Sequence, residues 1–120
     1  MLIVDAANVV GSRPNGWWRD RAKAAADLCR DLATAVQDGR LTAPVVVVLE
    51  GQARSGATEG DDVGVRVVHA KGSGDDAIVE LVAQAVAGGE NVTVATADRE
   101  LRERTKGAGG EVIGPRSLRY

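Results

Sequence analysis

Acidic residues follow apolar, β-rich runs at three places in this chain of 120 residues. Asp5 ends the segment LIVD, the pair Asp75–Asp76 follows VGVRVVHA and a short glycine-rich stretch, and Asp98 follows VTVATA. Parallel strands of an open α/β sheet end along one edge, so these carboxylates are expected to converge although they lie far apart in the sequence. Hard divalent cations prefer carboxylate oxygens as ligands. The sequence therefore predicts a divalent-metal site that contains Asp5, Asp75 or Asp76, and Asp98.

Each of these acids also has a simpler structural explanation. Asp5 could bond to backbone groups of a turn at the end of its strand, and the later acids could cap or stabilise helix N-termini. We favour the metal site because the acids recur at the same place relative to a strand. Of the adjacent pair, we expect Asp75 to face the cleft, with Asp76 as the alternative, while the other carboxylate caps the helix.

Polar and basic residues accompany two of the acidic segments. Asn8 follows Asp5 by one turn and is expected to orient that carboxylate or a phosphate group through hydrogen bonds. Thr96 precedes Asp98 at the end of a strand, Arg99 opens a basic stretch, and both are expected to bind substrate. These basic side chains could contact a phosphodiester, although on a short exposed helix such residues more often only face water. His69, the only histidine, has no Ser-His-Asp spacing around it and is left out of the site.

The segment GSRPNGWWRDR combines two of the three aromatic residues of the chain with arginines. Trp17 and Trp18, beside Arg13 and Arg19, suit base stacking together with phosphate contacts. The simpler alternative is that one tryptophan anchors this long loop on the core. Neighbouring side chains of an extended segment point in opposite directions, so we expect one anchored and one exposed indole ring.

Composition narrows the class of protein. A formal net charge of −2 and a pI near 5.4 argue against a protein that binds nucleic acid through bulk positive charge, but not against a nuclease with a local acidic centre. Cys29 is the single cysteine, which excludes an internal disulfide, and its helical spacing predicts a small core residue. No signal peptide precedes the first strand and no apolar run approaches the roughly 20 residues of a membrane span, so a cytoplasmic protein is expected.

Hydrophobic periodicity predicts a single α/β domain over residues 1–120. Apolar runs without alternation indicate buried parallel strands, and apolar residues three and four apart indicate helices. We expect strands at Met1–Val4, Val45–Leu49, Val63–Ala70, Asn91–Thr96 and Glu111–Gly114, helices at Arg19–Gln37, Asp75–Ala87 and Asp98–Lys106, and loops at Gly11–Gly16 and Gly51–Asp62, the second of them mobile. Strands that alternate with helices predict a three-layer sandwich around a mostly parallel five-stranded sheet.

These motifs resemble the NYN domains of the PIN-like nuclease fold and, within them, the YacP-like group. The resemblance runs nearly end to end and is carried by an acid and an asparagine after the first strand, an acid at the start of the helix after the third strand, and a Thr-x-Asp-x-Glu element after the fourth. The residues concerned are Asp5, Asn8, Asp75 beside Asp76, Thr96, Asp98 and Glu100.

The resemblance implies a strand order of 3-2-1-4-5 and a metal-dependent endoribonuclease, a hydrolase of RNA phosphodiester bonds. It implies that Asp5, Asp75 and Asp98 hold one or two Mg²⁺ or Mn²⁺ ions, with Glu100 as a further ligand. RNA is the expected partner, and the ribosome is a further candidate. One departure concerns the second strand, which ends in Glu50 where many relatives carry Asp, so the role of Glu50 is left open.

Three other functions compete with this interpretation. The first is a non-catalytic module of the same fold that binds RNA or protein. The second is a phosphoacceptor regulator, which needs an Asp at the end of a central strand, where this chain has Glu50, and a Lys near the last strand, where it has Arg116. The third, a haloacid-dehalogenase-type phosphatase, is disfavoured because Asp5 is followed by two alanines and not by a second acid.

Overall fold

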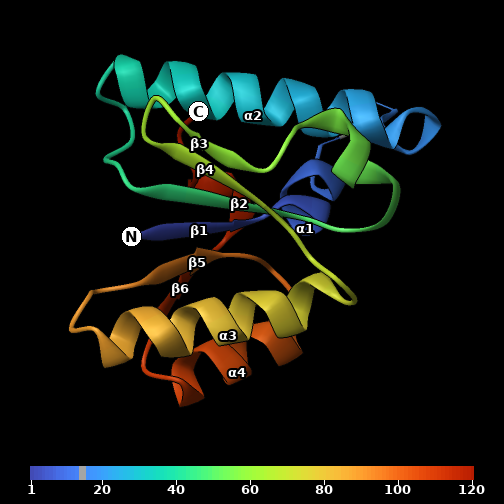
Figure 1. Ribbon diagram of the computed structural model, residues 1–120. Helices are drawn as coiled ribbons and strands as arrows, with labels where there is room; N and C mark the ends of the chain where they lie inside the picture. The colour runs from blue at the N-terminus through green and yellow to red at the C-terminus, as the bar shows by residue number, and fades with distance from the viewer. Residues whose placement is uncertain (14–15) are drawn as a thin grey trace.

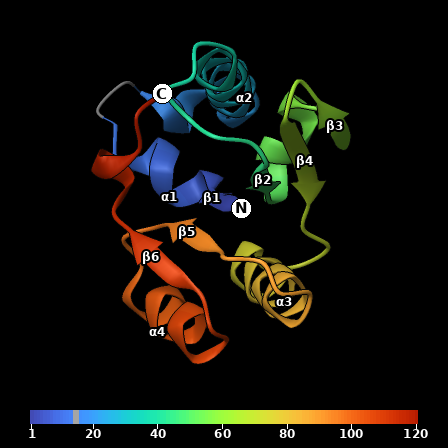
Figure 2. The ribbon, with the colours of Figure 1, turned by 90° about the vertical axis from the view of Figure 1, so that its left-hand side faces the viewer.

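A mixed sheet lies between two layers of helices in the computed structural model, which describes residues 1–13 and 16–120. The strands are β1 (Leu2–Asp5), β2 (Val45–Leu49), β3 (Gly60–Asp62), β4 (Val65–His69), β5 (Thr93–Ala95) and β6 (Glu111–Ile113). The α-helices are α1 (Ala6–Gly11), α2 (Arg21–Gln37), α3 (Gly74–Ala87) and α4 (Arg99–Gly107). Short 3-10 helices are η1 (Trp17–Arg19), η2 (Gly51–Gly56) and η3 (Pro115–Ser117). Seen along the strands in Figure 2, α2 covers one face of the sheet, and α3 and α4 cover the other.

The sheet has the order β3-β4-β2-β1-β5-β6, and every pair except β3–β4 is parallel. Without β3 this is the expected order 3-2-1-4-5, so the three-layer α/β prediction is confirmed with one strand added at an edge. Strand β1 lies in the middle, paired with β2 on one side and β5 on the other. The carboxyl ends of these three strands therefore lie next to one another.

The extra strand comes from the segment Gly51–Asp62, where a mobile loop was expected. That prediction is wrong, because the segment forms η2 and then β3, which pairs antiparallel with β4. The expected strand Val63–Ala70 begins two residues late, since Val63 and Gly64 form the hairpin turn with φ angles of 52° and 81°. Two-residue hairpin turns favour Asn or Gly at such positions. Val63 is a β-branched residue typical of strands, so the sequence did not predict a turn at this position.

The remaining elements follow the sequence with small shifts, except near the N-terminus. The short helix α1 was not predicted, and the first long helix starts at Arg21 and not at Arg19. Asp20 caps it, because its Oδ1 accepts a hydrogen bond of 2.9 Å from the Lys23 N–H. Of the expected loop Gly11–Gly16, Gly11 ends α1, and residues 14–15 lie outside the described residues.

Two aliphatic cores fix the layers, one on each face of the sheet. Successive side chains of β2 alternate between them: Val47 lies in the core between the sheet and α2, and Val46 and Val48 lie in the core between the sheet and α3. Cys29 packs half-buried against the α2 core, as expected, and burial raises the pKa of its thiol to about 11. In the described part of the chain, none of the helices is both long and apolar enough to cross a membrane.

Candidate active site

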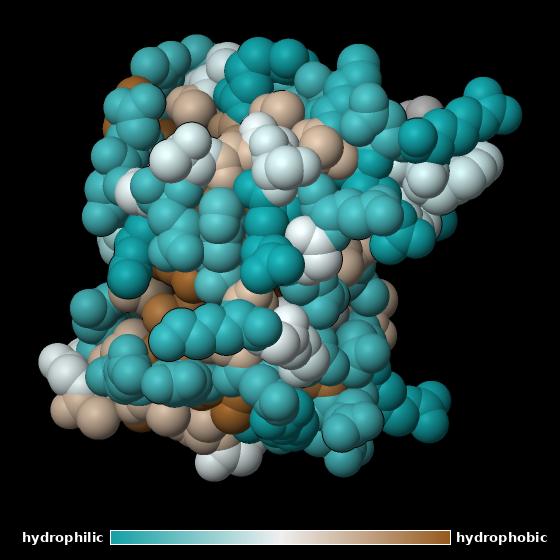
Figure 3. All heavy atoms as spheres, turned by 45° about the vertical axis from the view of Figure 1, so that its right-hand side comes forward, coloured by the Kyte–Doolittle hydropathy of each residue, from teal (hydrophilic) through white to brown (hydrophobic). Residues whose placement is uncertain are grey.

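Five carboxylates lie where the strands end, and we call them the acidic edge: Asp5, Glu50, Asp75, Asp98 and Glu100. Asp5 ends β1, Glu50 follows β2, Asp75 lies in the first turn of α3, and Asp98 and Glu100 begin α4 after β5. The strands run toward the side of α1 in Figure 1, and the surface brought forward from that side in Figure 3 is mostly hydrophilic. The sheet thus brings together the acids that the sequence predicted would converge.

Asp5 is the buried member of this set. Only 6% of its surface is exposed, and its Oδ2 accepts a hydrogen bond of 2.9 Å from the Thr96 hydroxyl. The pKa of Asp5 is raised to about 6, first by burial and then by the negative charges of Asp75 and Glu50, against the lowering effect of hydrogen bonds from Thr96 and the Asn8 backbone. A buried carboxylate with acidic neighbours is costly unless a cation or a proton compensates its charge.

The loop after β5 is held in place by β1 and α1. Thr96 is fully buried, donates to Asp5, and accepts a hydrogen bond of 3.1 Å from the Asp98 N–H. Thr96 was expected to bind substrate, whereas in this structure its side chain is buried and its hydroxyl forms two hydrogen bonds within the protein. Its role is to position Asp5 and the backbone of Asp98.

Asn8 and Arg102 complete this support. The Asn8 Oδ1 accepts a hydrogen bond of 2.8 Å from the Ala97 N–H, and the Arg102 Nη1 donates one of 2.9 Å to the Thr96 carbonyl oxygen. Asn8 therefore connects α1 to the loop that carries Asp98. The sequence suggested that Asn8 orients Asp5 or a phosphate group; its backbone does hydrogen-bond to the Asp5 carboxylate, while its side-chain oxygen holds the loop after β5.

Glu50 joins β2 to the start of α3. Its Oε2 accepts a hydrogen bond of 2.8 Å from the Gly74 N–H, and a Cβ at position 74 would lie 3.2 Å from the Glu50 Cδ. A side chain at position 74 would therefore require Glu50 to shift by a few tenths of an ångström. The signal for Glu50 was present in the sequence, since it is an acid directly after a buried strand.

The adjacent aspartates of α3 separate in space. Asp75 is half-buried, and its pKa is raised first by burial and then by the charges of Asp98 and Glu50. Asp76 is exposed and forms an ion pair of 2.9 Å with Arg104, which lowers the pKa of Asp76. The structure therefore places Asp75 on the acidic edge and Asp76 outside it.

Neither aspartate caps α3, which corrects the expectation for that pair. Ser73 is the cap, and its hydroxyl accepts a hydrogen bond of 3.1 Å from the Asp76 N–H. In α4 the simpler explanation holds in part, because the Asp98 Oδ1 caps the helix by accepting from the Leu101 N–H at 2.8 Å. Asp98 nevertheless remains exposed, and its charge acts on Asp75 together with that of Glu100.

The fold and these motifs match a known family. A family model described as the YacP-like NYN domain matches residues 2–120. This chain belongs to the YacP-like NYN family. Among solved structures, Rae1 (YacP) from Bacillus subtilis is similar to the NYN domain with a TM-score of 0.77 and 23% identity, over 98% of this chain and 70% of that one. A mutant of the same protein gives a TM-score of 0.68 and 21% identity over the same shares.

These identities show a shared fold. No curated protein matches the chain. The family is nuclease-like, and the observed sheet order agrees with the order that the resemblance implied. The six-stranded sheet of this NYN domain therefore presents its acidic edge on a nuclease-type scaffold.

The donor chemistry of the NYN domain suits Mg²⁺ or Mn²⁺, because every polar group of the acidic edge is a carboxylate. Burial first, and neighbouring negative charges second, raise the pKa of Asp5 and of Asp75, and a divalent cation would favour the charged form of both. Within residues 1–13 and 16–120, no three His, Cys, Asp or Glu side chains are arranged so that they could hold one ion. Protein-bound Mg²⁺ usually keeps several waters and takes only one or two carboxylates together with substrate phosphates, so the residues present fit such an ion.

The tryptophan segment of the NYN domain lies next to α1. Trp18 is 56% exposed and Trp17 is half-buried, so one ring is anchored and one is exposed as expected, although the segment is a 3-10 helix and not extended. The two rings meet edge to face at 6.1 Å. Arg19 lies 5.8 Å from the Trp18 ring centroid, and Arg13 lies 4.8 Å from that of Tyr120. Arg99 is exposed at the start of α4.

Proposed function

We propose that this NYN domain is a metal-dependent endoribonuclease that hydrolyses RNA phosphodiester bonds at the acidic edge. The observation that carries the proposal is the concentration of carboxylates at the strand ends, where burial and mutual repulsion raise the pKa of both Asp5 and Asp75. Strongly perturbed carboxylates in a group are typical of catalytic and metal-binding sites. The nuclease-like family is the second support.

Each residue of the acidic edge would have a distinct part. Asp5 and Asp75 would be the principal metal ligands, and Asp98 and Glu100 would contribute outer carboxylates or bind metal-bound water. A bound Mg²⁺ or Mn²⁺ supplies Lewis acidity, which lowers the pKa of water and stabilises charge on the phosphate. Thr96 would keep Asp5 in one orientation through its hydroxyl. Arg99, which is exposed beside Asp98, would contact a phosphate of the RNA.

Cleavage of single-stranded RNA by the purified protein tests the proposal. We expect products with Mn²⁺ or Mg²⁺ and none with EDTA. Asp5→Asn should lower the rate more than about 100-fold, since losing only an outer partner of a metal ligand already costs about 10- to 100-fold. Unaltered cleavage by Asp5→Asn and Asp98→Asn, with the fold intact by circular dichroism, would refute it.

One observation favours a second candidate, a non-catalytic module that binds RNA. No three acidic, His or Cys side chains of the described residues are arranged for one ion. That candidate predicts full RNA affinity in EDTA and no products under Mn²⁺. The proposal extends to ribosome-associated RNA as substrate and to a cytoplasmic location, which co-sedimentation with ribosomes after cell fractionation would test.

A further inference from the structure

A cavity of about 350 Å³ opens directly beside the acidic edge, on the α2 side of the sheet. Its walls come from α1, η1, the start of α2 and η2, and they include Ala7, Val10, Trp17, Arg21, Glu50 and Gln52. Two of its lining residues connect it to the candidate active site, because Ala6 follows Asp5 in the chain and Glu50 belongs to the acidic edge. The volume lies within the roughly 300 to 1,000 Å³ of small-ligand sites.

Trp17 is the aromatic wall of this cavity, and its surroundings hold it in place. The Arg21 guanidinium lies 5.2 Å from the Trp17 ring centroid, which is a cation–π contact. Trp18 meets Trp17 edge to face, and a Cβ at Gly11 would come within 3.7 Å of the Trp17 ring. A ring fixed in this way can stack on a planar ligand without first losing rotamer freedom.

Hydrogen-bonding side chains line the cavity together with its apolar residues. Glu50 uses Oε2 to accept from the Gly74 N–H, and its Oε1 is a second acceptor. Gln52 offers an amide, and Arg21 offers a guanidinium, so the cavity carries both donors and acceptors. An apolar, aromatic slot with a few polar groups matches a nucleobase, which has a flat apolar face and a polar edge.

We propose that this cavity binds one unstacked nucleobase of single-stranded RNA, next to the phosphodiester bond at the acidic edge. That the ligand is RNA rests on the proposed function; the cavity adds that the RNA is single-stranded. A base inside a duplex is stacked between its neighbours and cannot enter a pocket unless it leaves the helix. The cavity therefore selects single-stranded segments, with Trp17 as the stacking residue.

The two tryptophans of the chain make the proposal measurable without any cleavage. In Trp18→Phe the only tryptophan is Trp17, and in Trp17→Phe it is Trp18. Each variant is titrated with a short single-stranded RNA in EDTA while tryptophan fluorescence is recorded. We expect quenching of Trp17 by single-stranded RNA, little quenching by the same sequence in a duplex, and a smaller change at Trp18. An unchanged Trp17 signal at RNA concentrations that saturate binding overturns the proposal.

A variant that fills the cavity provides the second measurement. Ala7 is exposed on α1 and lines the cavity, so Ala7→Leu adds volume there without removing a core side chain. Ala83→Leu, at an exposed position of α3, is the matched control. We expect Ala7→Leu to weaken binding of single-stranded RNA in EDTA about fivefold or more, the lower range for loss of one base stack, and Ala83→Leu to leave it unchanged. Equal affinities of the two variants would overturn the proposal.

These readouts separate the cavity from catalysis. Quenching of Trp17 by RNA without any products under Mn²⁺ would support the base site and refute the endoribonuclease. Normal cleavage by Ala7→Leu, with Trp17 unquenched, would refute the base site and support the endoribonuclease. Circular dichroism and thermal unfolding of Ala7→Leu and Ala83→Leu confirm that both variants are folded.

Discussion

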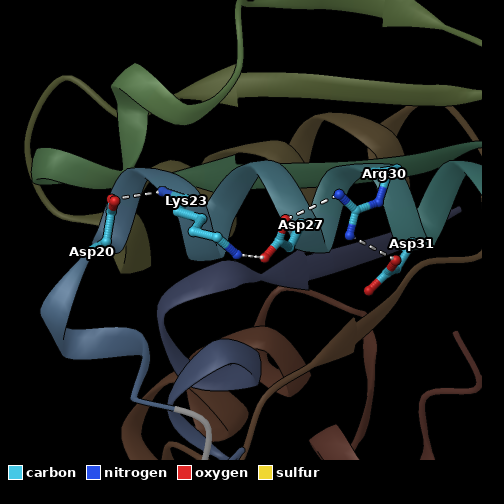
Figure 4. A network of polar contacts seen from close by, with 5 residues as sticks. All are labelled: Asp20, Lys23, Asp27, Arg30 and Asp31. Atoms are coloured by element: carbon cyan, nitrogen blue, oxygen red, sulfur yellow. Dashed lines mark hydrogen bonds and ion pairs between the residues drawn. The ribbon is translucent and has the colours of Figure 1, made fainter.

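Acidic residues stand in two opposite environments in this molecule. On the outer side of α2, Asp27 bonds to Lys23 at 2.8 Å and to Arg30 at 3.1 Å, while Asp20 caps the helix, as Figure 4 shows. The bond from Lys23 is the main reason that the pKa of Asp27 is lowered. On the acidic edge, burial and like charges raise the pKa of Asp5 and Asp75.

The difference shows which acids stabilise the fold and which do not. Asp27 lies near Lys23 and Arg30 at helical spacing, so its charge is compensated within one element. The acids of the edge come from four separate strand ends, and the fold brings them together at a cost in free energy. Structure retained against such a cost is better explained by function than by stability.

The largest difference is expected between two neighbouring acids in the first turn of α3, Asp75 and Asp76. Asp75→Asn should lower metal-dependent RNA cleavage more than about 100-fold. It removes a proposed metal ligand, and losing only a hydrogen-bond partner of such a ligand already costs about 10- to 100-fold. Asp76→Asn should leave cleavage nearly unchanged, since Asp76 is paired with Arg104 outside the acidic edge. Initial rates under Mn²⁺ measure both variants.

The order of these two effects is the decisive point. Equal losses in Asp75→Asn and Asp76→Asn would mean that both carboxylates serve the reaction, and that the ion pair with Arg104 opens when RNA binds. Circular dichroism of both variants controls for folding. Both residues lie in the first turn of α3, so the two substitutions have similar effects on the helix dipole, and a difference in cleavage reflects the two side chains.

The buried threonines offer a second matched pair. Thr96→Val removes the hydroxyl that donates to Asp5, and Thr105→Val removes a buried hydroxyl that has no hydrogen-bond partner in the described structure. We expect Thr96→Val to lower cleavage about 10- to 100-fold and to cost about 1 to 3 kcal/mol of stability. Thr105→Val should be neutral or stabilising in urea unfolding. A reversed ranking would show that Thr96 does not support Asp5.

The sequence contains most of this arrangement, and its omissions have physical causes. Asp5 and Asp98 could be placed because acids after buried strands need only the sheet topology to meet. The partnership of Asp5 with Thr96 was also within reach, since Val4 pairs with Ala95 in register and the next residues of both strands must then be neighbours. It was missed because the burial of Thr96 depends on how the following loop folds.

Other features required packing that no local pattern encodes. The ion pair between Asp76 and Arg104 joins two helices that lie side by side only after the sheet forms. The bond from Gly74 to Glu50 joins residues that are 24 positions apart, with η2, β3 and β4 between them. Strand β3 was hidden because Val63 occupies a turn position with a positive φ, where a β-branched residue is strained.

The charge of Asp5 should also be visible as a dependence of stability on pH. The pKa of Asp5 is about 6 in the folded protein and 3.8 in the unfolded chain, so between these values the folded state binds a proton that the unfolded state has released. The stabilisation is complete below about 3.8 and is lost as the pH rises through about 6.

The Asp5→Asn variant isolates this effect from all other carboxylates. From about pH 7 to about pH 4.5, in EDTA, the wild type should gain about 2 kcal/mol of unfolding free energy relative to Asp5→Asn. Urea unfolding at the two pH values measures the difference. Parallel pH profiles for the two proteins would mean that the Asp5 carboxylate is already compensated in the folded state.

The smallest effect is expected at the compensated acids of α2. Asp27→Asn removes both ion pairs of that residue, but these pairs face water, where pairing gains little free energy and salt screens it. RNA cleavage should not change, and a small shift in thermal unfolding should disappear at high ionic strength. If Asp27→Asn instead lowered cleavage as strongly as Asp75→Asn, the loss of any negative surface charge, wherever it lies, would lower cleavage. The position of the acidic edge at the strand ends would then lose its meaning as a functional signal.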